Sequence, residues 1–396
     1  MALPSVARPS RPLQNCSFPL YTAGSSSFAA PSLPHSRLAI CWAGKEQGAS
    51  CNIVREAGLS TRAVVEAATH HSLPPPTEFS WPFGFETRYE LGEVLGRGSF
   101  GTVRVATDRR NGQVLAVKII PKTSTKKNIE PERILHRIHE EVDVLQRIQK
   151  CSEALHLYEI FESDSHVYLV TDRCLGGTLE DFIRKHGSCT EGESAQVAHD
   201  ILRVLLECHD QGILYADVKP ANFLLINPYP DAQKLNDGDF SHQRIQIKVA
   251  DFGCAQRVME GQKLHKRTGT PLYMAPELFM QYYGLESDMW ALGILLYQML
   301  AGELPFWEPG GDRSPWAIMT GILEGELIFE GEKWENVSED AIDLVRRLLD
   351  RDYSTRISAA EALQHPWILS QCGSEGCLFD DEAVARMPIL QERQPA

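Results

Sequence analysis

The chain has 396 residues, a formal net charge of −14 and an apolar fraction of 43%. The length suggests two to three structural units, the apolar fraction is ordinary for a folded chain, and the negative charge argues against a nucleic-acid partner, which normally meets a basic stripe. No apolar run approaches the roughly 20 residues of a membrane span, and the ten scattered cysteines are typical of reduced intracellular thiols.

The first part of the chain, residues 1–63, is predicted to be a disordered transit peptide. Between Met1 and Gly44 it has no Asp or Glu, it is rich in Ser, Ala and Pro, and three arginines supply its charge. Such a stretch cannot bury enough apolar surface to fold, and its composition is typical of organelle targeting. Its prolines would break the helix of a mitochondrial presequence, so we expect the protein in the chloroplast stroma, with the cytoplasm or the mitochondrion as alternative locations. The alternative role for the segment itself is a disordered regulatory tail.

A folded domain is predicted over residues 88–369. Residues 64–87, with three consecutive prolines, are expected to form a linker, and residues 370–396 a C-terminal tail. Within the domain, residues 89–95 alternate as a strand, a glycine-rich turn follows, and residues 102–106 return as a second strand.

The glycine-rich turn predicts a nucleotide site. Its glycines let backbone N–H groups approach phosphates without a Cβ in the way. The alternative, a plain hairpin with a glycine turn, is disfavoured because Ala-Val-Lys follows at residues 116–118. The expected binding residues of this turn and its flanks are Leu95, Gly96, Arg97, Gly98, Ser99, Phe100, Gly101, Thr102 and Val103.

Lys118 lies on an apolar strand predicted over residues 114–120. A buried ammonium is costly unless it is paired, so we expect it to contact phosphates and a helix carboxylate. Glu141 is the predicted carboxylate, with its neighbour Glu140 as the alternative.

Two further motifs supply acids. Residues 215–222 read Tyr-Ala-Asp-Val-Lys-Pro-Ala-Asn, and Asp-Phe-Gly follows at residues 251–253. Behind a glycine-rich turn and a strand lysine, these motifs have the order and spacing of protein kinases. The chain resembles a eukaryotic-type Ser/Thr protein kinase, and in finer detail the calcium-dependent and calmodulin-dependent protein kinase group of plants and algae.

That resemblance implies an α+β, bilobal protein kinase fold, with a small β-rich N-lobe over residues 88–172 and a large helical C-lobe over 176–369. It implies ATP and Mg²⁺, with catalytic roles for Asp217 and Lys219 and metal binding by oxygens of Asn222 and Asp251. The resemblance also implies an adenine pocket formed by Val103, Ala116 and Leu224 and a hinge that includes Asp172 and Cys174. Thr171 takes the gatekeeper position, and its small side chain should leave the pocket behind it open to bulky inhibitors.

Three departures from the family pattern change the expectations. No EF-hand motif is found, so we expect no direct calcium binding. Ala216 replaces the arginine that normally binds a phosphate on the activation loop, so we predict an enzyme that does not need phosphorylation of Thr268; Lys263, Lys266 and Arg267 remain alternative phosphate ligands. The uncharged residues Thr178, Ala221 and Gln298 leave the preference around the target open.

We expect Ser/Thr-bearing protein substrates and a monomeric enzyme. The alternative function is a pseudokinase scaffold that binds nucleotide, which the intact set of Lys118, Asp217, Asn222 and Asp251 argues against. Residues 227–246 are predicted to form a surface loop. Cys254, Cys372 and Cys377 are candidate redox thiols, with free structural thiols as the simpler interpretation.

Overall fold

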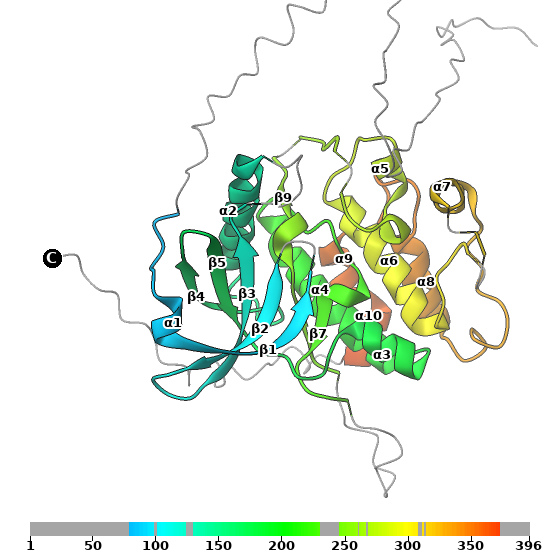
Figure 1. Ribbon diagram of the computed structural model, residues 1–396. Helices are drawn as coiled ribbons and strands as arrows, with labels where there is room; N and C mark the ends of the chain where they lie inside the picture. The colour runs from blue at the N-terminus through cyan, green and yellow to red at the C-terminus, as the bar shows by residue number, and fades with distance from the viewer. Residues whose placement is uncertain are drawn as a thin grey trace, which may run out of the picture. The chain divides into compact units, whose positions relative to one another are not determined.

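The computed structural model describes residues 79–98, 101–123, 130–229, 245–259, 261–266, 268–307, 311–312 and 314–372. Within them a five-stranded antiparallel sheet, with one short helix before it and one helix between its third and fourth strands, is followed along the chain by a set of helices (Figure 1). The predicted α+β, two-lobed arrangement is confirmed. The predicted leader, most of the 227–246 loop, the end of the tail and the turn residues Ser99 and Phe100 lie outside the described residues.

The sheet has the strand order β1-β2-β3-β5-β4. Its strands are β1 (Tyr89–Arg97), β2 (Thr102–Asp108), β3 (Val114–Pro121), β4 (Leu157–Glu162) and β5 (His166–Thr171). The strands predicted at 89–95, 102–106 and 114–120 are confirmed, whereas β4 carries too little alternation to have been expected.

Strand β3 places its lysine in the middle of the sheet. Lys118 lies opposite Val103 of β2 on one side and opposite Leu169 of β5 on the other. Its neighbour Val117 is fully buried on the opposite face of the strand, as the period of two along a strand requires.

Helix α2 (Pro131–Arg147) follows the sheet strand β3 and supplies the carboxylate of the site. A proline in the first turn suits its start, because that turn has no N–H partner to lose. Ile134, Ile138 and Val142 recur at a spacing of four and are buried in the main apolar core, which is the pattern of a helix packed along one face.

The C-lobe is built around two long helices. Figure 1 shows α4 and α6 (yellow) among shorter helices, and almost every residue of α6 is buried. The helices of this part are α3 (Leu179–His186), α4 (Glu191–Asp210), α5 (Pro276–Phe279), α6 (Glu286–Ala301), α7 (Pro315–Glu324), α8 (Glu339–Leu348), α9 (Ala359–Leu363) and α10 (Pro366–Cys372).

Two short antiparallel pairs hold the loops of the candidate site. They are β6 (Ile213–Leu214) with β9 (Gln256–Arg257), and β7 (Phe223–Leu225) with β8 (Ile247–Val249). Residues 215–222 therefore leave one pair and enter the other, and residues 250–255 do the same in the opposite direction.

Residues 79–87, placed in the linker from sequence, pack against the N-lobe. The short helix α1 (Phe85–Arg88) buries Phe85 beside Tyr168 of β5, with the two rings stacked at 4.5 Å. Among the described residues no helix combines the length and apolar character needed to cross a membrane.

Candidate active site

Lys118 joins three elements at one ammonium group. Its Nζ lies 2.5 Å from Glu141 Oε1 on α2 and 2.7 Å from Asp251 Oδ1 after β8. The predicted carboxylate, Glu141, is the one that contacts Lys118, whereas the alternative, Glu140, pairs with His136. The sheet, α2 and the Asp-Phe-Gly segment are thus held together by one set of charges.

The charges in this cluster stabilise one another. Burial alone would lower the pKa of Lys118, but the carboxylates of Glu141 and Asp251 outweigh it and raise that pKa above its ordinary value. Burial would raise the pKa of Asp251, and the ammonium of Lys118 brings it below its ordinary value instead. Both groups are therefore charged at neutral pH.

Asp217 lies at the centre of a second polar cluster. Its Oδ2 accepts hydrogen bonds from Lys219 Nζ at 2.6 Å and from Asn222 Nδ2 at 3.0 Å. Its Oδ1 accepts a 2.9 Å hydrogen bond from the hydroxyl of Thr270, which also accepts one from Lys219. The carboxylate is held in one orientation with a cation beside it.

Thr270 was not singled out as a site residue from sequence. It follows Gly269 in the segment that leads into α5, and no local pattern shows that its hydroxyl reaches a residue more than fifty positions earlier. The Gly-Thr pair ahead of Ala-Pro-Glu was the available signal. Gly269 itself has φ +91° and lies so close to Ala216 that a Cβ would come 2.6 Å from that residue's carbonyl oxygen.

The donor set fits a hard divalent cation. Asn222 uses its amide nitrogen for Asp217, donating to the backbone oxygen at 2.9 Å and to Oδ2, which leaves the amide oxygen as the end able to accept a metal. Asp251 has its carboxylate partly exposed, with the backbone in the left-handed region at φ 57°. Carboxylate and amide oxygens are ligands that Mg²⁺ prefers.

The backbone at the start of residues 215–222, called the catalytic loop below, is fixed by Asp288 of α6. Asp288 accepts hydrogen bonds from the N–H groups of Tyr215 and Ala216, at 2.9 and 2.8 Å. Ala216 has φ 67°, a conformation that costs a non-glycine residue free energy and persists only where surrounding contacts hold it. The Tyr215 ring packs edge-to-face on Phe252 at 5.2 Å, and both rings are fully buried. Leu145 of α2 and Leu157 of β4 are buried in the same core as these two rings.

The glycine-rich turn is open where a ligand would approach and tight where it meets the sheet. A Cβ on Gly96 would meet nothing within 4 Å, whereas one on Gly101 would come 2.4 Å from the carbonyl oxygen of Ile119. The turn is closed by a 2.9 Å hydrogen bond from Gly98 N–H to the Gly101 carbonyl oxygen. Gly101 therefore allows β2 to approach β3, and Gly96 leaves space above the sheet.

Three of the predicted adenine and hinge residues, Val103, Ala116 and Thr171, lie on neighbouring strands, whereas Leu224 lies on β7 and the hinge residues Asp172 and Cys174 follow β5. Ala116 on β3 is buried and pairs with Thr171, which ends β5. Asp172 is held in place, since its Oδ1 accepts from Tyr158 OH and its Oδ2 from His156 N–H, both at 2.9 Å. Burial raises the pKa of the hinge thiol, Cys174, to about 11. Val103 on β2, Leu224 on β7 and Gly96 on β1 are each half-buried.

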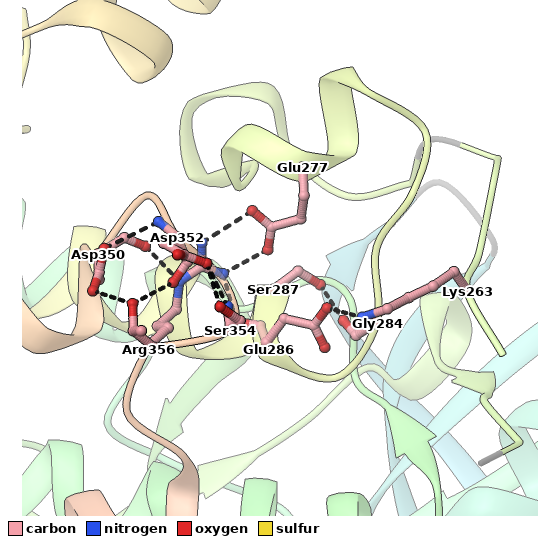
Figure 2. A network of polar contacts seen from close by, with 10 residues as sticks. Lys263, Glu277, Gly284, Glu286, Ser287, Asp350, Asp352, Ser354 and Arg356 are labelled. Carbon is pink, nitrogen blue, oxygen red and sulfur yellow. Dashed lines mark hydrogen bonds and ion pairs between the residues drawn. The ribbon is translucent and has the colours of Figure 1, made fainter. Parts of the chain in front are cut away.

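The activation segment, which runs from the Asp-Phe-Gly motif to Ala-Pro-Glu at residues 275–277, contacts the start of α6 through an ion pair (Figure 2). Lys263 forms an ion pair with Glu286, and its ammonium lies 4.7 Å from the centre of the Tyr353 ring. Leu264 and Tyr283 exchange two backbone hydrogen bonds of 2.8 and 3.3 Å. Lys263, one of the alternative phosphate ligands, is therefore already paired.

The same figure shows a buried ion pair beneath this contact. Arg356 donates to both carboxylate oxygens of Glu277, at 2.5 and 3.0 Å, and to the backbone oxygen of Glu286 at 2.8 Å. The end of the activation segment, the start of α6 and the turn before α9 are thus joined.

The candidate redox thiols are partly covered. Cys254 is half-buried, and burial raises its pKa, which favours the unreactive thiol. Cys372 is also half-buried, and Cys377 lies outside the described residues.

Comparisons with known proteins agree with this geometry. The protein kinase domain family matches residues 89–368. Calcium-dependent protein kinase 25 of Arabidopsis thaliana is 29% identical over 89% of this chain and 61% of its own length. CDPK-related kinase 7 of the same plant is 34% identical over 74% of this chain and 48% of its own. Calcium/calmodulin-dependent serine/threonine-protein kinase 1 of Oryza sativa subsp. japonica is 34% identical, covering 76% and 48%.

The chain belongs to the protein kinase family. Its relatives among plant calcium-dependent and CDPK-related kinases confirm the resemblance drawn from the motifs. The chain spans about half the length of most of these relatives.

Proposed function

We propose that this chain is a Ser/Thr protein kinase that transfers the γ-phosphate of ATP to hydroxyl groups of protein substrates without needing a phosphate on its activation segment. The observation that carries the proposal is the assembled cluster in which Lys118 contacts both Glu141 and Asp251. These three residues come from three separate elements, and their meeting is what a competent kinase site requires.

Each group in the two clusters has a place in the reaction. Asp217 accepts a hydrogen bond from the substrate hydroxyl and orients it for in-line attack, taking its proton. Lys219, 2.6 Å from Asp217, stabilises negative charge on the phosphoryl group as it transfers. Lys118 holds the donor phosphates under the glycine-rich turn, and Val103, Ala116 and Leu224 provide apolar faces for adenine.

Asn222 and Asp251 would hold Mg²⁺ through side-chain oxygens. When bound, Mg²⁺ neutralises charge on the donor phosphates. Both groups are already oriented and charged for metal binding. Lys118 lowers the pKa of Asp251 and so keeps it ionised, and the Asn222 amide nitrogen donates to Asp217, which leaves its oxygen for the metal.

Independence from activation-segment phosphate is supported by two features. At position 216 the side chain is a methyl group, so the catalytic loop offers no guanidinium to a phosphate. The segment is meanwhile attached by the Lys263–Glu286 pair and by a hydrogen bond from Tyr283 OH to the Lys266 backbone oxygen. Those contacts do for residues 263–266 what a phosphate does elsewhere, which is to fix the segment against the C-lobe.

The test uses the full chain, treated with phosphatase and checked by mass spectrometry for absence of phosphate. Labelled γ-phosphate transfer is measured with Mg²⁺ on a degenerate Ser/Thr peptide library for wild type, Asp217→Asn and Thr268→Ala. Wild type and Thr268→Ala should transfer at similar rates. Asp217→Asn should be slower by about 10² to 10⁴ while still binding ATP.

Three outcomes would count against the proposal. ATP binding by the wild type without any transfer would favour a nucleotide-binding scaffold. Transfer by wild type that Thr268→Ala abolishes would refute phosphate independence alone. Equal transfer by Asp217→Asn and wild type would remove Asp217 from its role.

A further inference from the structure

Residues Phe79 to Pro82, which end two residues before α1, form what we call the aromatic strap, and it packs on helix α2. Phe79 is 7% exposed, whereas Phe83, just beyond the strap, is 63% exposed. The rings of Phe79 and Trp81 stack at 4.3 Å, nearly parallel. His139 of α2 lies 4.5 Å from the Phe79 ring and 5.7 Å from the Trp81 ring, centre to centre. The strap is therefore a packed part of the N-lobe.

The backbone of the strap is anchored to the end of β4. Glu162 accepts hydrogen bonds from the N–H groups of Trp81 at 2.9 Å and Phe79 at 3.4 Å, and its own N–H donates to the carbonyl oxygen of Pro82 at 2.9 Å. Lys122, after β3, completes the anchor through a 2.6 Å ion pair with Glu162. This carboxylate is 2% exposed, and a buried acid is retained at low cost only when paired and hydrogen-bonded in this way.

The strap also contains a strained residue, Ser80, between Phe79 and Trp81 in the sequence. Ser80 has φ 58°, the left-handed region that a non-glycine residue adopts only where its surroundings fix it. The turn at Ser80 allows Phe79 and Trp81 to lie on the same side, as a stacked pair. Both rings therefore face His139 of α2 from one side of the strap.

The strap contacts α2 within one turn of the residue that enters the site, but on a different face of the helix. His139 precedes Glu141 by two positions on the same helix, and Phe79 belongs to the apolar core that contains Ile138 and Val142 on either side of them. Burial lowers the pKa of His139, so at neutral pH its uncharged ring packs as an aromatic. A shift or rotation of α2 would withdraw Glu141 from Lys118, and the strap opposes that movement from outside the helix.

We propose that Phe79 and Trp81 are positioning residues of this enzyme, which hold α2 so that Glu141 reaches Lys118. The strap makes the chain supply its own support for this helix, from residues that precede the span shared with the protein kinase family. The catalytic part of the inference rests on the proposed kinase function, whereas the structural part, support of α2, does not.

The test compares the full-chain variant Phe79→Ala/Trp81→Ala with Phe83→Ala, a matched loss of an aromatic side chain from an exposed position in the same segment. Hydrogen exchange of backbone amides is measured in α2 and in α6, together with kcat and the KM for ATP. In the double variant, exchange in α2 should rise about tenfold or more while α6 is unchanged, and kcat/KM for ATP should fall at least about fivefold. Phe79→Leu/Trp81→Phe, which retains apolar contact with His139, should recover most of both effects, and Phe83→Ala should match wild type.

The outcomes separate the two levels of the proposal. Unchanged exchange in α2, or an equal rise in α2 and α6, would show that the strap adds no specific support to this helix and would overturn the inference. Faster exchange in α2 with kcat/KM intact would also overturn it, since the aromatic pair would then be structural only. A wild type that transfers no phosphate would sink the proposed function, while the exchange measurement would still decide whether the strap supports α2.

Discussion

Removing the charge of Lys263 tests whether the activation segment is held without phosphate. Lys263→Met keeps most of the length and apolar character of the side chain but cannot pair with Glu286. Lys266→Met is the matched control, because Lys266 is an exposed lysine of the same segment whose contact with Tyr283 is made by its backbone oxygen. Each variant is prepared as the full, dephosphorylated chain.

The expected magnitude follows from the contacts that are lost. A hydrogen bond between charged groups contributes about 1.5–3 kcal/mol, and the low end applies here because the two side chains are 22% and 21% exposed. The cation over the Tyr353 ring adds about 0.5–1 kcal/mol. A total of about 2 kcal/mol corresponds to a roughly 30-fold rise in the population of the open segment.

Hydrogen exchange at Leu264 and Tyr283 is the direct assay, since their N–H groups bond each other's carbonyl oxygens across the contact. Both amides should exchange about 30-fold faster in Lys263→Met, and peptide phosphorylation should slow severalfold. Equal amide exchange rates and equal peptide phosphorylation rates for Lys263→Met and Lys266→Met would show that Lys263 does not hold the segment.

Two further variants test buried charges. Glu277→Gln leaves the guanidinium of Arg356, whose side chain is fully buried, without its counter-charge. This variant should lower the free energy of unfolding by about 3–5 kcal/mol and the Tm by roughly ten degrees. Adding Arg356→Met should recover part of that loss in thermal unfolding. Burial would raise the pKa of Glu162, but the hydrogen bonds from Lys122 and from the N–H groups of Phe79 and Trp81, together with the charge of Lys122, outweigh burial and lower that pKa. The stabilising contribution of Glu162 is therefore present above its unfolded pKa of about 4.3 and is lost as the pH falls through the lower folded value. Urea unfolding between pH 6 and pH 3 should therefore show a steeper loss for wild type than for Glu162→Gln; parallel curves would contradict the assignment.

The parts of the site that could be predicted from sequence are those fixed by short spacings. Asp217 and Asn222 belong to one loop, and Lys118 lies on a strand that its apolar neighbours identify. Asp217 and Asn222 reach their partners because the pairs β6–β9 and β7–β8 position the loop that carries them, and Lys118 reaches its partners from β3. The choice between Glu140 and Glu141 was open, since adjacent helix residues differ only in direction and the direction is set by packing of α2.

The remaining contacts depend on partners far along the chain. Glu162 lies more than eighty residues after Phe79, so a segment rich in proline and aromatic residues could only be interpreted as a linker. Lys263 was recognised as a cation of the activation segment, but its pairing with Glu286 leaves no local pattern. Tertiary contact decides both cases, because neither depends on a repeating period.

The hydrogen bonds that Asp288 accepts have a consequence for how control over this enzyme is encoded. They come from the main chain of residues 215 and 216, so the shape of the catalytic loop does not depend on which side chain stands at position 216. The main chain at position 216 thus shapes the catalytic loop, whereas in the proposed function its side chain determines whether the loop offers a ligand to a phosphate. An arginine placed at position 216 would therefore leave both of these hydrogen bonds in place.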